Sequence, residues 1–174
     1  MKVLTLDQPF ASIVSLGLAQ WITDADPIKH KGEIAIHANA TKPNPGRIPK
    51  KHYGPWADRL GEVLELGRVA EPEVYGALPL SMIVAVITLG RSIPTGRYDP
   101  PAYDNDLKAF DFSKGRYMAP IVSVVPIAFE LKQKGVIPFE LWDLGRTREK
   151  AVRDLVDLFE LASENGGSDD DDDE

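Results

Sequence analysis

The sequence predicts an α+β fold in which short strands form a single mixed β-barrel flanked by helices. Strand-sized apolar segments and helical segments follow each other without the regular alternation that builds a parallel sheet. With 174 residues, 43% of them hydrophobic, the chain has the size of one ordinary domain. We expect a barrel domain over residues 1–145, a helix packed on it over 146–164, and a disordered acidic tail over 165–174.

The first part of the chain predicts three strands and two helices. Asp7 is a good helix cap ahead of Pro9, and Gly17 is a good helix stop. Trp56 and Leu60 lie at helical spacing in a later segment. The expected elements are a strand at 3–6, a helix from 7 to 17, strands at 21–23 and 33–38, a loop at 41–55 and a helix at 55–66.

The second part predicts further strands and one long helix. Pro126 is expected to interrupt the apolar segment in which it lies, because proline donates no hydrogen bond to a sheet. Val152, Leu155 and Val156 form one stripe of a helix. The expected elements are a strand at 79–89, a polar loop at 91–114, two strands within 117–129 and a helix at 146–162.

Several segments in a fixed order carry a recognisable pattern. They are residues 3–11, 17–24, 32–38 and 78–85 and the pair Leu141-Trp142. Together they resemble the ASCH family of small PUA-like β-barrels over about residues 1–144. The family motif is G-x-K-x-x-E-x-R. Gly17 is present, but Ala19, Ile22 and Asp24 stand where the family has lysine, glutamate and arginine.

The resemblance implies a cleft that meets RNA or a nucleoside, and some family members hydrolyse an acylated cytidine. Ala19 and Ile22 can neither activate a nucleophile nor act as a base, and Asp24 would repel an anion. We therefore expect a non-catalytic domain that binds RNA, a modified nucleoside or a nucleic-acid-associated partner. The expected ligand-binding residues are Gln8, Thr23, Asp24, Lys29, Lys31 and His37.

Two other functions stay open from the sequence. The first is a hydrolase acting on a modified nucleobase, with His37 and Asp24 as relocated catalytic residues, because a carboxylate beside a histidine can tune acid–base chemistry near neutral pH. In the competing interpretation, the charged residues near Pro27 are solvated loop residues, and His37 is hydrogen-bonded to the backbone. The second is a protein-interaction module that uses the acidic tail to bind a basic partner.

The charge distribution limits nucleic-acid binding to a local patch. The formal net charge is −7, and the acidic run from Asp169 to Glu174 accounts for six of these charges. The rest of the chain is nearly neutral, so it cannot bind a phosphate backbone strongly through overall charge. The predicted patch consists of cations that could bind phosphates and an aromatic residue that could stack on bases: Lys42, Arg47, Lys50, Lys51 and Tyr53.

The composition also excludes several classes of site. The chain has no cysteine, which rules out disulfides, thiolate zinc sites and cysteine nucleophiles. His30 and His37 match no metal-ligand spacing, and no phosphate-binding loop is present, so we expect no metal and no cofactor. With no signal peptide and no apolar run long enough to cross a bilayer, a cytoplasmic protein without membrane contact is expected.

Overall fold

A computed structural model of the chain describes most of its residues. The described ranges are 1–44, 50–67, 69–96, 110–133 and 136–165, without the side chains of 50–53 and 165. Within these ranges the chain forms a mixed α+β fold of seven strands and four helices. In chain order the elements are β1 (Lys2–Leu6), α1 (Phe10–Ser15), β2 (Trp21–Asp24), β3 (Gly32–Ala38), α2 (Lys50–Val63), α3 (Glu71–Ala77), β4 (Met82–Leu89), β5 (Ile93–Pro94), β6 (Tyr117–Glu130), β7 (Leu141–Asp143) and α4 (Arg146–Asn165).

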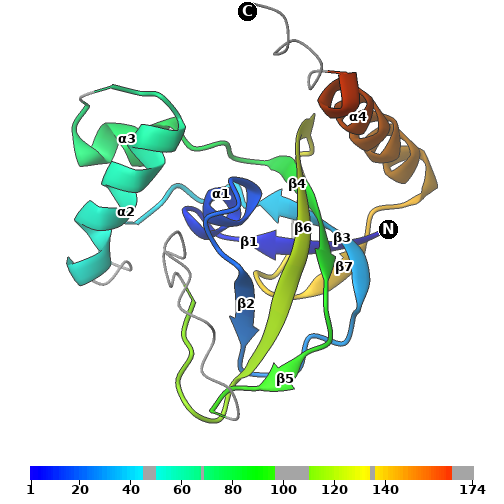
Figure 1. Cartoon of the computed structure of the whole chain (residues 1–174), viewed down its shortest axis with the longest axis horizontal. Helices are drawn as coiled ribbons and strands as arrows, with labels where there is room; N and C mark the ends of the chain where they lie inside the picture. The colour runs from blue at the N-terminus through cyan, green and yellow to red at the C-terminus, as the bar shows by residue number, and fades with distance from the viewer. Residues whose placement is uncertain (45–49, 68, 97–109, 134–135, 166–174) are drawn as a thin grey trace, which may run out of the picture.

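The strands form one sheet that curls into a half-barrel (Figure 1). Its order is β2-β6-β4-β3-β1-β7, with β5 pairing β6 beside this path. The pair of β1 and β3 is parallel, and the other pairs are antiparallel. β2 and β7 stand at the two ends of the order, so the barrel is open between them.

The inner face of the sheet carries the main core. Leu4 and Leu6 of β1 and Ile34 and Ile36 of β3 are fully buried there, because alternate side chains of a strand point to the same face. Helix α1 lies over this face, and α2 with α3 forms a layer beyond it (Figure 1). Trp56 of α2 is buried in this core.

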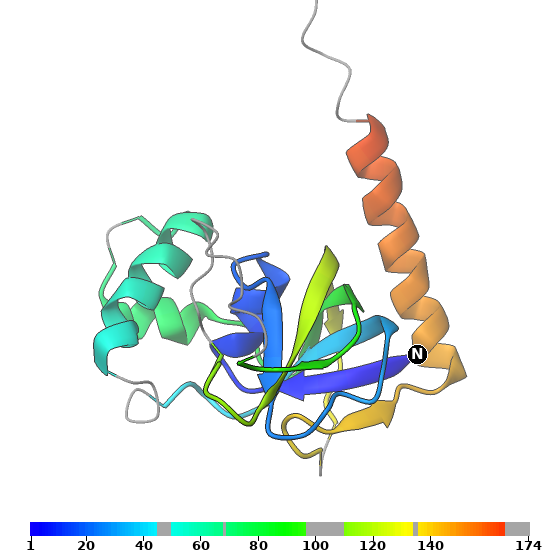
Figure 2. The same cartoon turned by 60° about the horizontal axis from the view of Figure 1, so that its bottom comes forward.

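The outer face carries a second, smaller core beneath α4. The buried residues Val3 and Ala35 point to this side, as the strand alternation requires. Val152 of α4 is fully buried among them. Figure 2 shows that only the first part of α4 lies against the sheet, and the rest extends beyond it. None of the helices in the described ranges has the length and hydropathy of a membrane-spanning segment.

Two helix starts differ from the prediction. α1 begins at Phe10 after the N-cap Pro9, and no side chain caps it, so the expected cap by Asp7 is wrong. Gln8 instead accepts a hydrogen bond from the Ser12 N–H at 3.1 Å. α2 begins at Lys50 rather than at Pro55. The prediction put the start at Pro55 because proline favours the first turn of a helix. In the structure Pro55 lies inside α2.

The sheet also differs from the prediction in its details. β6 is one continuous strand, and the register of its pairing with β4 shifts near Pro126. A local irregularity accommodates the missing N–H there, so the expected break into two strands is wrong. The short elements α3, β5 and β7 were not predicted, because two to seven residues carry little periodic signal.

Candidate functional site

A cleft of about 420 Å³ lies where the half-barrel is open, between the end of β2 and the start of β7. One wall comes from the loop after β2, and the other comes from the segment that leads into β7. We call it the edge cleft. Its charged lining residues are Asp24, Asp26, Lys29 and Glu140. Its apolar lining residues are Pro27, Ile28, Ile137, Pro138, Phe139 and Leu141.

The charges of the edge cleft are mainly negative. Three carboxylates face it, against the single ammonium of Lys29. Asp24 is half-buried, and its Oδ1 accepts a hydrogen bond from the Ala25 N–H, which holds the side chain at the turn. A phosphate group would meet net repulsion here, whereas amino and ring N–H groups would find acceptors.

The apolar wall is held in an unusual backbone conformation. Phe139 has φ of 67°, in the left-handed region that non-glycine residues seldom adopt. Its N–H donates to the Thr5 carbonyl at 2.9 Å, which ties the wall to β1. Strained residues that the surrounding structure holds in place concentrate at ligand sites. The half-buried Phe139 ring and the exposed Ile137 give the cleft an apolar side.

The other candidate residues are not among the lining residues of the edge cleft. Gln8 is buried, and its amide is used internally, since Nε2 donates to the Pro79 carbonyl at 2.6 Å and Oε1 accepts from Ser12. Thr23 is also buried, and its Oγ1 has no hydrogen-bond partner within the described part of the structure. Lys31 is exposed and is not among the lining residues of the cleft.

His37 lies on the outer face of the sheet, in a complete hydrogen-bond network. Its Nε2 donates to the Leu131 carbonyl at 3.1 Å. Its Nδ1 is 3.2 Å from the Thr5 hydroxyl, which in turn accepts from the Trp142 indole N–H at 3.0 Å. Because a carbonyl only accepts, Nε2 carries the proton of the neutral ring and Nδ1 accepts from Thr5.

Burial lowers the pKa of His37 below the usual value of 6.5, and the hydrogen bond to the Leu131 carbonyl opposes this shift. The side chain is 1% exposed, and the Trp142 ring meets it edge to face at 6.0 Å between centroids. The neutral form is therefore favoured near pH 7. Both ring nitrogens are occupied, so the imidazole has no free position for a general base acting in the edge cleft.

The predicted basic patch cannot be assembled from the described residues. Lys42 is exposed, ahead of α2. Arg47 lies outside the described residues, and so do the side chains of Lys50, Lys51 and Tyr53, although α2 includes these three positions. The acidic tail at 166–174 also lies outside the described residues.

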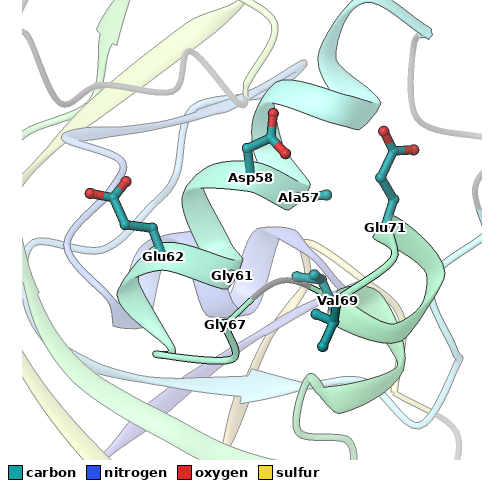
Figure 3. Close-up of a pocket in the computed structure, with 8 residues that line it drawn as sticks. Ala57, Asp58, Gly61, Glu62, Gly67, Val69 and Glu71 are labelled. Atoms are coloured by element: carbon teal, nitrogen blue, oxygen red, sulfur yellow. The ribbon is translucent and has the colours of Figure 1, made fainter.

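A second hollow, of about 330 Å³, lies between α2 and α3. Figure 3 shows Asp58 and Glu62 on α2 and Glu71 at the start of α3, three of the residues that line this hollow together with Ala57 and Gly61. Arg59 pairs with Glu62 at 2.7 Å, which offsets part of this charge. No sequence-predicted site residue lines this hollow.

Sequence reasoning missed the second wall of the edge cleft. Residues 137–141 contribute half of its lining, yet Ile137, Pro138 and Phe139 form no motif. They line the cleft only because they lie directly before the edge strand β7, and the position of β7 at the edge depends on the order of the strands in the sheet. Asp24 and Lys29 are the two predicted ligand-binding residues that the structure brings to the cleft.

Comparison with protein-family models and with curated proteins finds no match for this chain. Among the described residues, no group of three or more histidine or acidic side chains could hold a metal ion. The candidate site therefore rests on its own geometry, an acidic and apolar cleft at the open side of the half-barrel.

Proposed function

We propose that the chain is a non-catalytic binding domain of the ASCH type, and that the edge cleft takes the base of an uncharged, modified nucleoside. The observation that carries the proposal is the position of Asp24. In the proposed resemblance this residue stands where the family has arginine, and it lines a cleft at the opening of the half-barrel.

The chemistry of the cleft favours a base over a phosphate. A base has an apolar face that can pack on Phe139 and Pro138, and N–H groups that can donate to Asp24 or Asp26. Three carboxylates against one lysine disfavour a phosphate in the same space. Nucleic acid could still bind through a base turned into the cleft, with its phosphates outside.

Binding without catalysis is favoured by the environment of His37. Its two ring nitrogens bond to Thr5 and Leu131, and burial lowers its pKa. A hydrolase would need a general base with a free nitrogen or oxygen near the ligand. We therefore expect no release of cytidine from N-acetylcytidine above background; release that disappears in His37→Gln would favour the hydrolase alternative instead.

Calorimetry with a nucleoside and its monophosphate tests the binding proposal. N-acetylcytidine is expected to bind more tightly than N-acetylcytidine 5′-monophosphate. Asp24→Asn should weaken nucleoside binding at least about ten-fold, which corresponds to the loss of one charge-assisted hydrogen bond. Asp58→Asn is the matched control, because Asp58 is an exposed carboxylate of the second hollow. Tighter binding of the monophosphate, or a larger effect of Asp58→Asn, would contradict the proposal.

A further inference from the structure

Thr5 of β1 connects the buried His37 to the second wall of the edge cleft. Its carbonyl accepts the Phe139 N–H at 2.9 Å. Its hydroxyl lies 3.2 Å from the His37 Nδ1 and accepts from the Trp142 indole N–H at 3.0 Å. We call residues 137–140 the wall turn, and this turn leads directly into β7, which contains Trp142. One residue therefore holds the chain of the second wall at two points, through its backbone and through its side chain.

The wall turn has a conformation that its own sequence does not favour. The Glu140 N–H donates to the Ile137 carbonyl at 3.2 Å, which puts Pro138 second and Phe139 third in the turn. Proline suits the second position, but the φ of 67° at the third position favours glycine over phenylalanine. Such a residue keeps this conformation only while the surrounding structure holds it. The position of the wall turn therefore depends on contacts from outside it, and the bond to Thr5 is one of them.

Of the strands around His37, β7 is held by the fewest pairings. It pairs with β1 at three positions, and in the described part of the chain it pairs with no other strand. β1 also pairs with β3 at five positions, and β3 lies between β1 and β4. Elements with few contacts open first when a structure is disturbed locally. A disturbance at His37 is therefore expected to move β7 and the wall turn before it moves β1 or β3.

Protonation of His37 is such a disturbance. The neutral ring donates from Nε2 to the Leu131 carbonyl and accepts at Nδ1 from the Thr5 hydroxyl. A second ring proton turns Nδ1 into a donor, so the Thr5 hydroxyl proton loses its acceptor. It also places a charge on a side chain that is 1% exposed. Movement of Trp142, whose ring meets the imidazole edge to face, would relieve both effects by letting water reach the ring.

Charged groups on the surrounding elements do not neutralise this proton. Among the described residues, the ring nitrogens of His37 bond only to Thr5 and Leu131. β4 contains no charged residue. The charged groups on the other strands beside the ring and on the packed part of α4 pair with one another or are exposed: Lys2 with Asp143, Glu130 with Lys132, Glu33 with Arg153, Glu149 with Arg153 and the Met1 amino group, and the exposed Arg146, Arg148 and Lys150.

We propose that the charge state of His37 controls the second wall of the edge cleft: the neutral imidazole holds the wall in place through Thr5, and the imidazolium releases it. Burial lowers the pKa of His37 while the wall is held, so a fall in pH below the usual 6.5 shifts the population towards the released wall. Thr5 is then a positioning residue of the cleft. The effect on ligand affinity rests on the proposed function, whereas release of the wall needs no ligand.

An NMR titration of the free protein from about pH 8 to about pH 5 tests release of the wall. The His37 ring protons, the Trp142 indole N–H and the Phe139 amide should shift together, with one midpoint below 6.5. His37→Gln should abolish the shifts of the other two groups. The matched control is His30→Gln, which removes a histidine bonded to the Glu33 carbonyl at 3.0 Å and should leave them unchanged. Wall signals that stay fixed down to about pH 5, whether or not His37 titrates, overturn the proposal.

Calorimetry with N-acetylcytidine tests the positioning role of Thr5. Wild type should bind about three- to ten-fold more weakly at about pH 5.5 than at about pH 7.5, since one proton and one pH unit below 6.5 limit the change to about ten-fold. Thr5→Val keeps the shape of the side chain without the hydroxyl, so it should bind at least about five-fold more weakly than wild type at about pH 7.5 and lose the pH dependence. Thr5→Ser should restore both. A Thr5→Val protein with the affinity and pH profile of wild type overturns the positioning role, and if this variant does not fold, the NMR titration decides.

The two experiments separate this inference from the proposed function. Wall signals that titrate with His37 in a protein that does not bind N-acetylcytidine would support release of the wall and contradict the proposed ligand. Equal binding at both pH values, with wall signals that stay fixed, would overturn the inference and leave the proposed ligand in place.

Discussion

The neutral imidazole of His37 joins three strands and the segment after β6. Thr5 is the central hydroxyl, because it donates to His37 and accepts from Trp142. Leu131, directly after β6, accepts the remaining ring proton. The network needs His37 uncharged, since a second ring proton would leave the Thr5 hydroxyl without its acceptor. We therefore assign His37 to stability.

This assignment predicts a pH dependence of stability. The pKa of His37 is lower in the folded protein than the usual 6.5, so the unfolded chain takes up the proton first as the pH falls. The contribution is complete above pH 6.5 and declines as the pH falls from there towards the folded-state pKa, by at most about 1.4 kcal/mol per pH unit.

Urea unfolding of wild type and His37→Gln at about pH 7.5 and about pH 5.5 measures this effect. Glutamine keeps hydrogen-bonding groups but does not titrate. The loss of unfolding free energy between the two pH values should be smaller in the variant than in wild type. An equal loss in both proteins would show that His37 does not cause it.

The sequence could predict only part of the site at the level of residues. Asp24 and Lys29 were found from their place beside a motif, and both line the edge cleft. Gln8 and Thr23 belong to the same pattern, yet they are buried. The sequence alone does not show whether a polar residue near a strand points to the core or to solvent, because this depends on the register of strand pairing.

At the scale of elements, the close contact of β4 with β6 depends on one glycine. A Cβ atom on Gly90 would lie 2.5 Å from the Cγ of Pro120, and the rigid proline ring cannot move aside easily. The Gly90 N–H also donates to the Pro120 carbonyl at 2.8 Å, which fixes the approach. Any side chain here must force the two segments apart.

Two alanine variants should therefore change stability in opposite directions. Gly90→Ala should destabilise the fold by about 1–3 kcal/mol. Gly76→Ala, in α3, should stabilise it by about 0.5–1 kcal/mol, because no atom lies within 4 Å of the added methyl group and alanine favours a helix. Denaturant unfolding of both variants measures the difference. A neutral Gly90→Ala would refute the close contact.

Among the elements, those with strong periodicity were predicted well. β1, β3 and α4 have near the expected bounds, because each buries a regular stripe. α2 begins five residues before its predicted start, because proline is typical of the first turn of a helix and Pro55 instead lies inside α2. β5 and β7 are two and three residues long, and tertiary pairing alone defines them.

At the scale of the whole molecule, the negative net charge opposes association with a phosphate backbone. Of the net charge of −7, the run Asp169 to Glu174 supplies six negative charges. Deleting these residues should strengthen binding to single-stranded RNA at low salt, and the gain should shrink near physiological salt, where the Debye length is about 8 Å. Fluorescence anisotropy at two salt concentrations measures the RNA affinity of each protein. Combining Lys50→Ala with Lys51→Ala is expected to weaken binding. An unchanged affinity would remove the tail from any role in nucleic-acid binding.

The opening of the half-barrel is the property of the whole molecule that creates the site. The sequence predicted an α+β barrel, but the order that leaves β2 and β7 at opposite ends depends on pairings between residues far apart in the chain. The edge cleft follows from that order, because it lies between these two strands. No local pattern encodes it.

An amide NMR titration with N-acetylcytidine tests the central claim most directly. Binding in the edge cleft predicts saturable shifts at Asp24 to Lys29 and at Ile137 to Leu141, with little change at Asp58 to Glu71 in the second hollow. Asp24→Asn should reduce the shifts at a given ligand concentration. Shifts confined to the second hollow would contradict the account. So would the absence of shifts up to about 10 mM ligand, because this concentration exceeds even a millimolar dissociation constant.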